Sequence, residues 1–196
     1  MPVTALDPTS ALVVIDLQNG VVALPGTPHP TTEVVARTAE LAGAFRDRGL
    51  PVVLVRVSFA KDGADLIPGR TEAASPRGAQ RPEGWDQIVD VLAGDPRDIV
   101  VTKRNWSAFY GTDLDLHLRR RGVTQIVLTG VATSIGVDST ARGAHERGYH
   151  VTVATDAVTD MNEDAHRHST EKIFPRLGET GTTAEILDLL AKTEVR

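Results

Sequence analysis

Short apolar stretches alternate with amphipathic stretches along the chain, and this alternation constrains the fold more than any other feature. The apolar stretches are rich in Val and Ile with little polar alternation, which predicts strands covered on both faces: Ala11–Asp16, Val52–Val57, Asp98–Thr102, Gln125–Thr129 and His150–Ala154. Helical periodicity predicts helices over Thr32–Arg48, Asp113–Arg121, Ser134–Arg147 and Asp164–Phe174, and a last helix that begins at a Thr182–Glu185 capping box. Strands that alternate with helices predict a three-layer α/β/α sandwich with a mostly parallel, Rossmann-like sheet.

The composition favours a single domain over residues 1–196. Hydrophobic residues make up 41% of the chain and charged residues 24%, which is ordinary for a globular protein. The longest apolar runs are far shorter than the roughly 20 residues that a membrane-spanning helix needs. The first residues lack the charged and apolar regions of a secretory signal. We therefore expect a cytoplasmic protein that makes no membrane contact.

Charge and missing motifs narrow the classes of ligand. A net charge of −5 argues against a nucleic-acid binder, which would carry a basic excess. The sequence has neither a dinucleotide-binding nor a phosphate-binding glycine motif, and its histidines do not have the spacing of a metal site. The absence of cysteine excludes thiol catalysis. We expect a small-molecule substrate and neither cofactor nor metal.

Charged residues follow the ends of two predicted strands. In a parallel sheet ligands bind beyond the carboxyl ends of the strands, so Asp16, Lys103 and the turn Thr129–Thr140 should meet at one crevice. Desolvation at the end of an apolar strand should raise the pKa of Asp16, and a nearby Lys103 should lower it. The pair therefore suits proton transfer. A structural reading stays open, in which Asp16 caps a loop and Lys103 is its scaffold partner.

Two further stretches bear on a pocket. Trp106, Phe109 and Tyr110 cluster after Lys103, which suits the wall of a pocket for an unsaturated ligand but also suits packing of a loop onto the core. The stretch Phe59–Trp85 is rich in Gly, Pro and Arg, and its length favours a loop that covers a pocket or meets a partner subunit over a plain surface excursion. Trp106 is the first candidate for a ligand contact.

Three motifs in order resemble the isochorismatase-like, or cysteine hydrolase, family. They are Asp16-Leu17-Gln18, then Lys103 followed by Ser107-Ala108-Phe109, and Gly130-Val131-Ala132-Thr133 leading into Val137-x-x-Thr140-Ala141. The resemblance covers about Thr9 to Leu190. It implies a sheet of about six strands and assembly into homo-oligomers, either dimers or tetramers. It also implies a non-proline cis peptide bond between Val131 and Ala132.

The resemblance implies an unusual chemistry. Most family members use an Asp, a Lys and a Cys to hydrolyse amides through a thioester, but this chain has Gly136 at the cysteine position. Glycine there is similar to members that hydrolyse isochorismate, an enol ether that an acid cleaves without a nucleophilic side chain. On that resemblance Asp16 donates the proton, Lys103 orients it or holds a substrate carboxylate, and Gly136 leaves room. The residues expected to contact substrate are Gln18, Trp106, Phe109, Val131, Ala132, Thr133, Ser134 and Ile135.

Departures from the family pattern widen the substrate class. Isochorismate-cleaving members carry Tyr-Ala-His-Ile-Gly where this chain reads Ala132-Thr133-Ser134-Ile135-Gly136. The prediction is therefore an acid-catalysed, metal-independent hydrolase of an enol ether or a related small carboxylate.

Two alternatives remain open. The chain could be an inactive family member that binds a small molecule or an oligomeric partner, which Gly136 motivates. It could also be a phosphohydrolase of the haloacid-dehalogenase type built on Asp16, Lys103 and Asp156, although that class needs an Asp where Gln18 stands.

Overall fold

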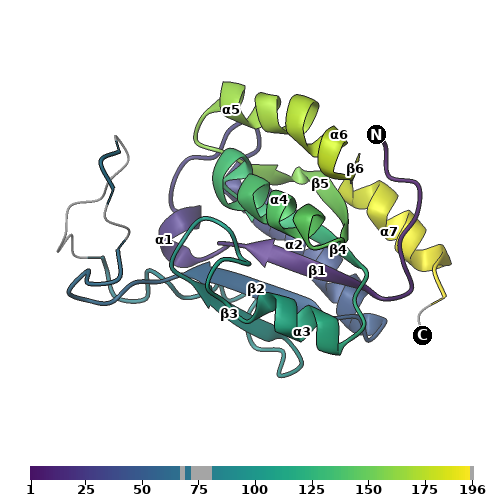
Figure 1. Cartoon of the computed structure of the whole chain (residues 1–196), viewed down its shortest axis with the longest axis horizontal. Coiled ribbons are helices and arrows are strands. Elements are labelled where there is room, and N and C mark those ends of the chain that lie inside the picture. The colour runs from purple at the N-terminus through teal and green to yellow at the C-terminus, as the bar shows by residue number, and fades with distance from the viewer. Residues whose placement is uncertain (67–68, 72–80, 195–196) are drawn as a thin grey trace.

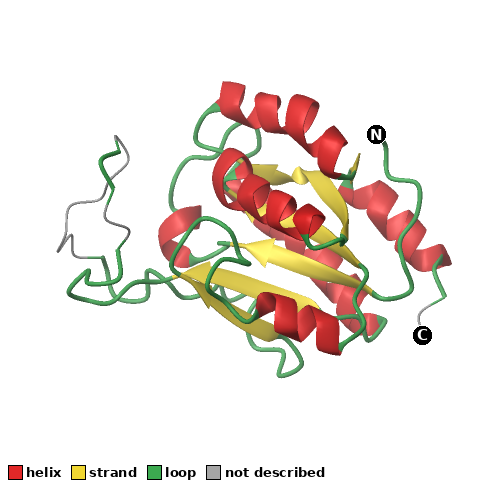
Figure 2. Ribbon diagram, viewed as in Figure 1, coloured by secondary structure: helices red, strands yellow, loops and turns green. Residues whose placement is uncertain are grey.

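The chain forms a parallel sheet between two layers of helices (Figures 1 and 2). The structure, a computed structural model, describes residues 1–66, 69–71 and 81–194. In these residues the sheet has six strands in the order β3-β2-β1-β4-β5-β6, and every neighbouring pair is parallel. The strands are β1 (Ser10–Ile15), β2 (Val52–Val57), β3 (Ile99–Lys103), β4 (Gln125–Val131), β5 (His150–Thr159) and β6 (Glu179–Gly181). The predicted three-layer fold is confirmed.

Helices lie between most successive strands, but in the described residues β2 and β3 have none between them, and the last helix follows the last strand. The helices are α1 (Asn19–Val22), α2 (Thr31–Asp47), α3 (Leu114–Arg120), α4 (Asp138–Glu146), α5 (Glu163–His168), α6 (Phe174–Leu177) and α7 (Thr183–Lys192). Two π-helical turns, η1 (Thr133–Val137) and η2 (Ser169–Ile173), precede α4 and α6. None of the helices in the described part of the chain is long and apolar enough to cross a membrane.

The two faces of the sheet bury separate apolar cores. Along β1 alternate side chains enter opposite cores, because successive residues of a strand point to opposite faces. Ala11, Val13 and Ile15 pack toward the layer of α3, α4 and α6, whereas Leu12 and Val14 pack toward α2 and α7. All of β1 is buried, as its apolar sequence predicts.

The sequence-based boundaries needed four corrections, and the first is that β5, predicted to end at Ala154, continues to Thr159. The short strand β6 and the single-turn helix α1 were not predicted, since three or four residues carry no readable period. The helix predicted to stop at Pro175 instead continues through η2 into α6. Pro175 lies in the first turn of α6, directly after the π-helical turn η2. The capping box at Thr182 and Glu185 is confirmed.

The strand order places a crevice at the centre of the sheet. From β1 the chain builds outward to β2 and β3, and it then returns to add β4, β5 and β6 on the other side. The carboxyl ends of β1 and β4, at Ile15 and Gly130, lie side by side in register. In open parallel sheets ligands bind at such a reversal of strand order.

Gly43 offers a test of the helical layer. It lies inside α2, and a Cβ added there would meet no atom within 4 Å. We expect Gly43→Ala to stabilise the protein by about 0.5–1 kcal/mol, because glycine costs more backbone entropy in a helix. The matched control is Gly49→Ala just beyond the helix, where a φ of +70° should make alanine destabilising by about 1 kcal/mol. Urea unfolding of both variants measures the difference.

Candidate active site

Asp16 directly follows β1 and turns the chain sharply. It is the one non-glycine residue with positive φ in the described part of the chain, at 53°. Its N–H donates to the Val55 carbonyl at 2.9 Å, which continues the ladder to β2, and its carbonyl accepts from the Gln18 N–H at 2.9 Å. A left-handed conformation is unfavourable for most residues and tolerated best by Asn, Asp and Gly. The turn therefore holds the Asp16 side chain at the carboxyl edge of the sheet.

Lys103 ends β3 and is the ion-pair partner of Asp16. Its Nζ lies 2.7 Å from Asp16 Oδ2, and the lysine is only 3% exposed. Nζ also donates to the carbonyls of Asn105 at 3.1 Å and Trp106 at 3.0 Å. A lysine ammonium has three donors, and all three are occupied here. Lys103 therefore orients Asp16, and it keeps no donor for a substrate carboxylate.

The second oxygen of Asp16 is not used by the scaffold. Among the described residues Asp16 Oδ1 makes no hydrogen bond, although the atom is buried. Burial raises the pKa of Asp16 to about 6 against the opposing charge of Lys103. A carboxyl group with such a pKa exchanges a proton near neutral pH.

The turn η1 faces Asp16 from the end of β4. The Val131–Ala132 peptide bond is cis, as predicted. A Cβ added at Gly136 would lie 3.0 Å from Ile15 Cγ2 and 3.4 Å from Asp16 Oδ2. Any side chain at position 136 would thus point toward the Asp16 carboxylate. Glycine leaves that space open.

Two residues that the sequence reasoning did not select hold this turn in place. Asp160 Oδ2 accepts from the Ser134 N–H at 2.7 Å, and Thr133 Oγ1 pairs with His166 Nδ1 at 2.9 Å. Burial lowers the pKa of His166, which favours its neutral form. The position of Asp160 near the end of β5, like that of Asp16 after β1, is the sequence signal that could have identified it.

A pocket of about 590 Å³ opens over these groups at the carboxyl end of the sheet. It is lined by Asp16, Val21, Val57, Phe59, Leu66, Gly69, Thr71, Arg81, Lys103, Arg104, Asn105, Trp106, Val131, Ala132, Ile135, Gly136 and Met161. Several of these come from the Phe59–Trp85 stretch. The described part of that loop therefore forms one wall of the pocket.

The structure brings most of the predicted site residues to this pocket but not all of them. Asp16, Lys103, Gly136, Trp106, Val131, Ala132 and Ile135 line it, whereas Gln18, Phe109, Thr133 and Ser134 do not. The side-chain amide of Gln18 is paired in both directions with the backbone of Val57. The Phe109 ring is buried and stacks on Tyr149 at a centroid distance of 5.9 Å.

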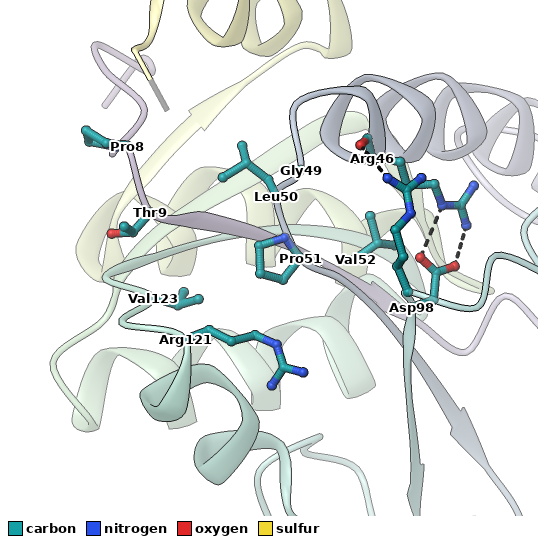
Figure 3. Close-up of a pocket in the computed structure, with 11 residues that line it drawn as sticks. Pro8, Thr9, Arg46, Gly49, Leu50, Pro51, Val52, Asp98, Arg121 and Val123 are labelled. Atoms are coloured by element: carbon teal, nitrogen blue, oxygen red, sulfur yellow. Dashed lines mark hydrogen bonds and ion pairs between the residues drawn. The ribbon is translucent and has the colours of Figure 1, made fainter. Parts of the chain in front are cut away.

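A second pocket, of about 330 Å³, lies at the opposite end of the sheet (Figure 3). It is lined where the amino ends of the strands meet the last turns of α2 and α3, at Gly49 and Arg121. Of the three arginines that line it, Arg46 is paired with Asp98 at 2.5 Å and Arg97 with Asp95 at 2.7 Å. Partial negative charge at helix C-termini does not favour an anionic ligand. We therefore place the candidate active site at the carboxyl end.

Comparison with known sequences identifies the family of the chain. Residues 10–185 match the isochorismatase domain family. The chain belongs to this family. It is 46% identical over 182 residues to the uncharacterised isochorismatase family protein YecD of Escherichia coli O157:H7, which covers 93% of this chain and 96% of the relative. It is 36% identical over 188 residues to the ureidoacrylate amidohydrolase RutB of Methylobacterium radiotolerans, which covers 83% of this chain and 72% of the relative.

Solved structures give the same family. An isochorismatase family protein of Burkholderia thailandensis superposes with a TM-score of 0.90 at 49% identity, over 95% of this chain and 98% of the other. The N-carbamoylsarcosine amidase of Thermoplasma acidophilum has a TM-score of 0.73 at 28% identity, over 89% and 96%. The protein is thus a hydrolase of the isochorismatase family, and this membership excludes the haloacid-dehalogenase alternative.

Proposed function

We propose that this protein cleaves an enol ether of a small carboxylate, such as isochorismate, by general acid catalysis without a metal ion. The observation that supports the proposal is the pairing of a buried Asp16 with Lys103 beside a glycine at the nucleophile position. An enol ether needs a proton donor and a water molecule but no covalent nucleophile. The site supplies the donor, and Gly136 supplies the space.

The reaction uses Asp16 in two protonation states. Protonated Asp16 transfers its proton to the terminal vinyl carbon, and the ether oxygen stabilises the resulting oxocarbenium ion. Water adds to that cation, and the hemiketal collapses to pyruvate and the free alcohol. The proton released by the added water restores Asp16. Throughout the cycle Lys103 holds Oδ2 and so fixes the orientation of the Asp16 carboxyl group.

Amide hydrolysis, the activity named for two of the similar proteins, requires a different use of the site. A thioester route needs a cysteine, and this chain contains none. Direct attack by water on an amide would need ionised Asp16 as a general base. The two chemistries therefore demand opposite protonation states of one carboxyl group.

The pH dependence of turnover separates the two chemistries. Purified protein with isochorismate and a chelator is expected to release pyruvate, with kcat/KM constant below about pH 6 and falling roughly tenfold per pH unit above it. The value of kcat/KM falls with rising pH because it is proportional to the protonated fraction of Asp16. Burial raises the pKa of Asp16 to about 6. A rate that rises with pH would indicate a base and contradict the proposal. No pyruvate at any pH would favour a binding role for the family fold.

A cytoplasmic location and assembly into dimers or tetramers remain predictions from the sequence and the family resemblance.

A further inference from the structure

The C-terminal end of the Phe59–Trp85 loop is hydrogen-bonded to α1, the short helix that follows Asp16. The N–H of Gly20 donates to the Trp85 carbonyl and that of Asn19 to the Gln87 carbonyl, both at 2.9 Å. A Cβ at Gly20 would lie 1.8 Å from the Trp85 ring. The indole therefore packs directly on the backbone of α1, four residues after Asp16. Only glycine at position 20 permits this approach.

Trp85 forms one half of an aromatic cradle around Arg81. The guanidinium carbon of Arg81 lies 4.7 Å from the centroid of the Phe59 ring and 4.9 Å from that of the Trp85 ring. An arginine guanidinium commonly stacks its face on aromatic rings, and these distances are consistent with such stacking. The N–H donors lie in that plane and point outward from its edges, so stacking leaves them available for a bidentate carboxylate.

The other cations near the pocket are committed to the scaffold. Lys103 donates its three N–H groups to Asp16 and to the carbonyls of Asn105 and Trp106. Arg104 donates from Nε to Asp65 at 2.7 Å, and its charge is compensated there. Arg56 donates to Thr102 and to the Asp86 carbonyl, and it does not line the pocket. Arg81 is the cation whose described contacts are aromatic and that lines the same pocket as Asp16.

We propose that Arg81 is the specificity residue that binds a carboxylate of the substrate. This inference rests on the proposed function only in placing the bound molecule at Asp16. Large apolar side chains, Leu66, Trp106, Ile135 and Met161, make up much of the remaining wall. Such a wall suits a flat unsaturated body rather than a sugar or a peptide. The substrate class is therefore an unsaturated carboxylate held by its anionic edge at Arg81.

Benzoate and its neutral isostere benzamide test this inference without any turnover. The two tryptophans of the chain are Trp85, which contacts Arg81, and Trp106, which lines the pocket, so intrinsic fluorescence reports on this site. We expect wild-type protein to bind benzoate more tightly than benzamide. Arg81→Gln should weaken benzoate binding by about 10–100-fold and leave benzamide unchanged, as expected for loss of a charge-assisted bidentate contact.

Two variants control the measurement. Arg81→Lys keeps the charge but loses the planar fork, and it should bind benzoate with an affinity between those of wild type and Arg81→Gln. Arg97→Gln removes an arginine that is paired with Asp95 at the opposite end of the sheet, and it should bind like wild type. Wild-type protein without preference for benzoate, or Arg81→Gln with wild-type affinity, would overturn the assignment.

Turnover then separates this inference from the proposed function. With isochorismate, Arg81→Gln should raise KM by at least about tenfold and change kcat by less than about threefold, because the contact exists in ground and transition states alike. If no pyruvate forms but benzoate binding still depends on Arg81, the enol-ether chemistry is wrong and the carboxylate site stands. If pyruvate forms with unchanged KM in the variant, the reverse holds.

Discussion

Replacement of Asp16 by asparagine is expected to reduce pyruvate release from isochorismate by about 10²–10⁴-fold, the usual contribution of a general acid. Asparagine has the same shape as protonated aspartic acid and can accept from Lys103 Nζ, but its amide cannot transfer a proton to carbon. The loss should therefore fall on kcat, with KM changed by less than about threefold. Steady-state kinetics at pH 5.5 measures it, since much of Asp16 is then protonated in the wild type.

The matched control is Asp65→Asn. Asp65 does not line the pocket but is paired at 2.7 Å with Arg104, which does, and its loss should change the rate by less than about threefold. Thermal unfolding of both variants checks that the fold is intact. An Asp16→Asn protein that keeps more than a tenth of the wild-type rate would mean that another group donates the proton.

The sequence could predict the sheet and the acid–cation pair because both depend on local patterns. Apolar runs rich in Val and Ile mark buried strands, and a parallel sheet brings the ends of its strands to one edge. Asp16 and Lys103 follow β1 and end β3, and the structure joins them at 2.7 Å across that edge, although β2 lies between the two strands.

Side-chain direction could not be predicted in the same way. Gln18 is two residues from Asp16, yet the left-handed turn at Asp16 sends it toward Val57 instead of the pocket. Phe109 is three residues from Trp106, yet it packs into the core against Tyr149. Closeness in sequence to a site residue does not decide which side of a loop a side chain takes.

Contacts between residues far apart in the chain could not be predicted from the sequence either. The cradle of Arg81 depends on the contact between Gly20 and Trp85, and the position of η1 depends on Asp160 and His166. Each of these contacts joins residues at least 26 positions apart in the chain. No periodicity encodes such pairs, because they arise only once the layers have packed.

Gly136→Cys is expected to lower pyruvate release by at least about 10²-fold while adding a reactive thiol. A Cβ at this position lies 3.4 Å from Asp16 Oδ2, so the attached sulfur occupies space beside the acid that the substrate or its attacking water needs. Displacement of a reacting group by about 1 Å can cost 10²-fold in rate. The variant should meanwhile be alkylated by iodoacetamide, to which the cysteine-free wild type offers no thiol.

Gly136→Ala distinguishes the effect of filling the space beside Asp16 from the effect of adding a thiol. It adds the Cβ alone, 3.0 Å from Ile15 Cγ2, and should lower the rate by less than the cysteine does, because less of the space is filled. Benzoate should slow alkylation of Gly136→Cys, and the additional Arg81→Gln change should remove that protection. A Gly136→Cys protein with wild-type turnover would show that the space beside Asp16 is not where the substrate reacts. With turnover lost and alkylation blocked by benzoate, carboxylate binding and proton transfer would share one pocket, which glycine at position 136 keeps open.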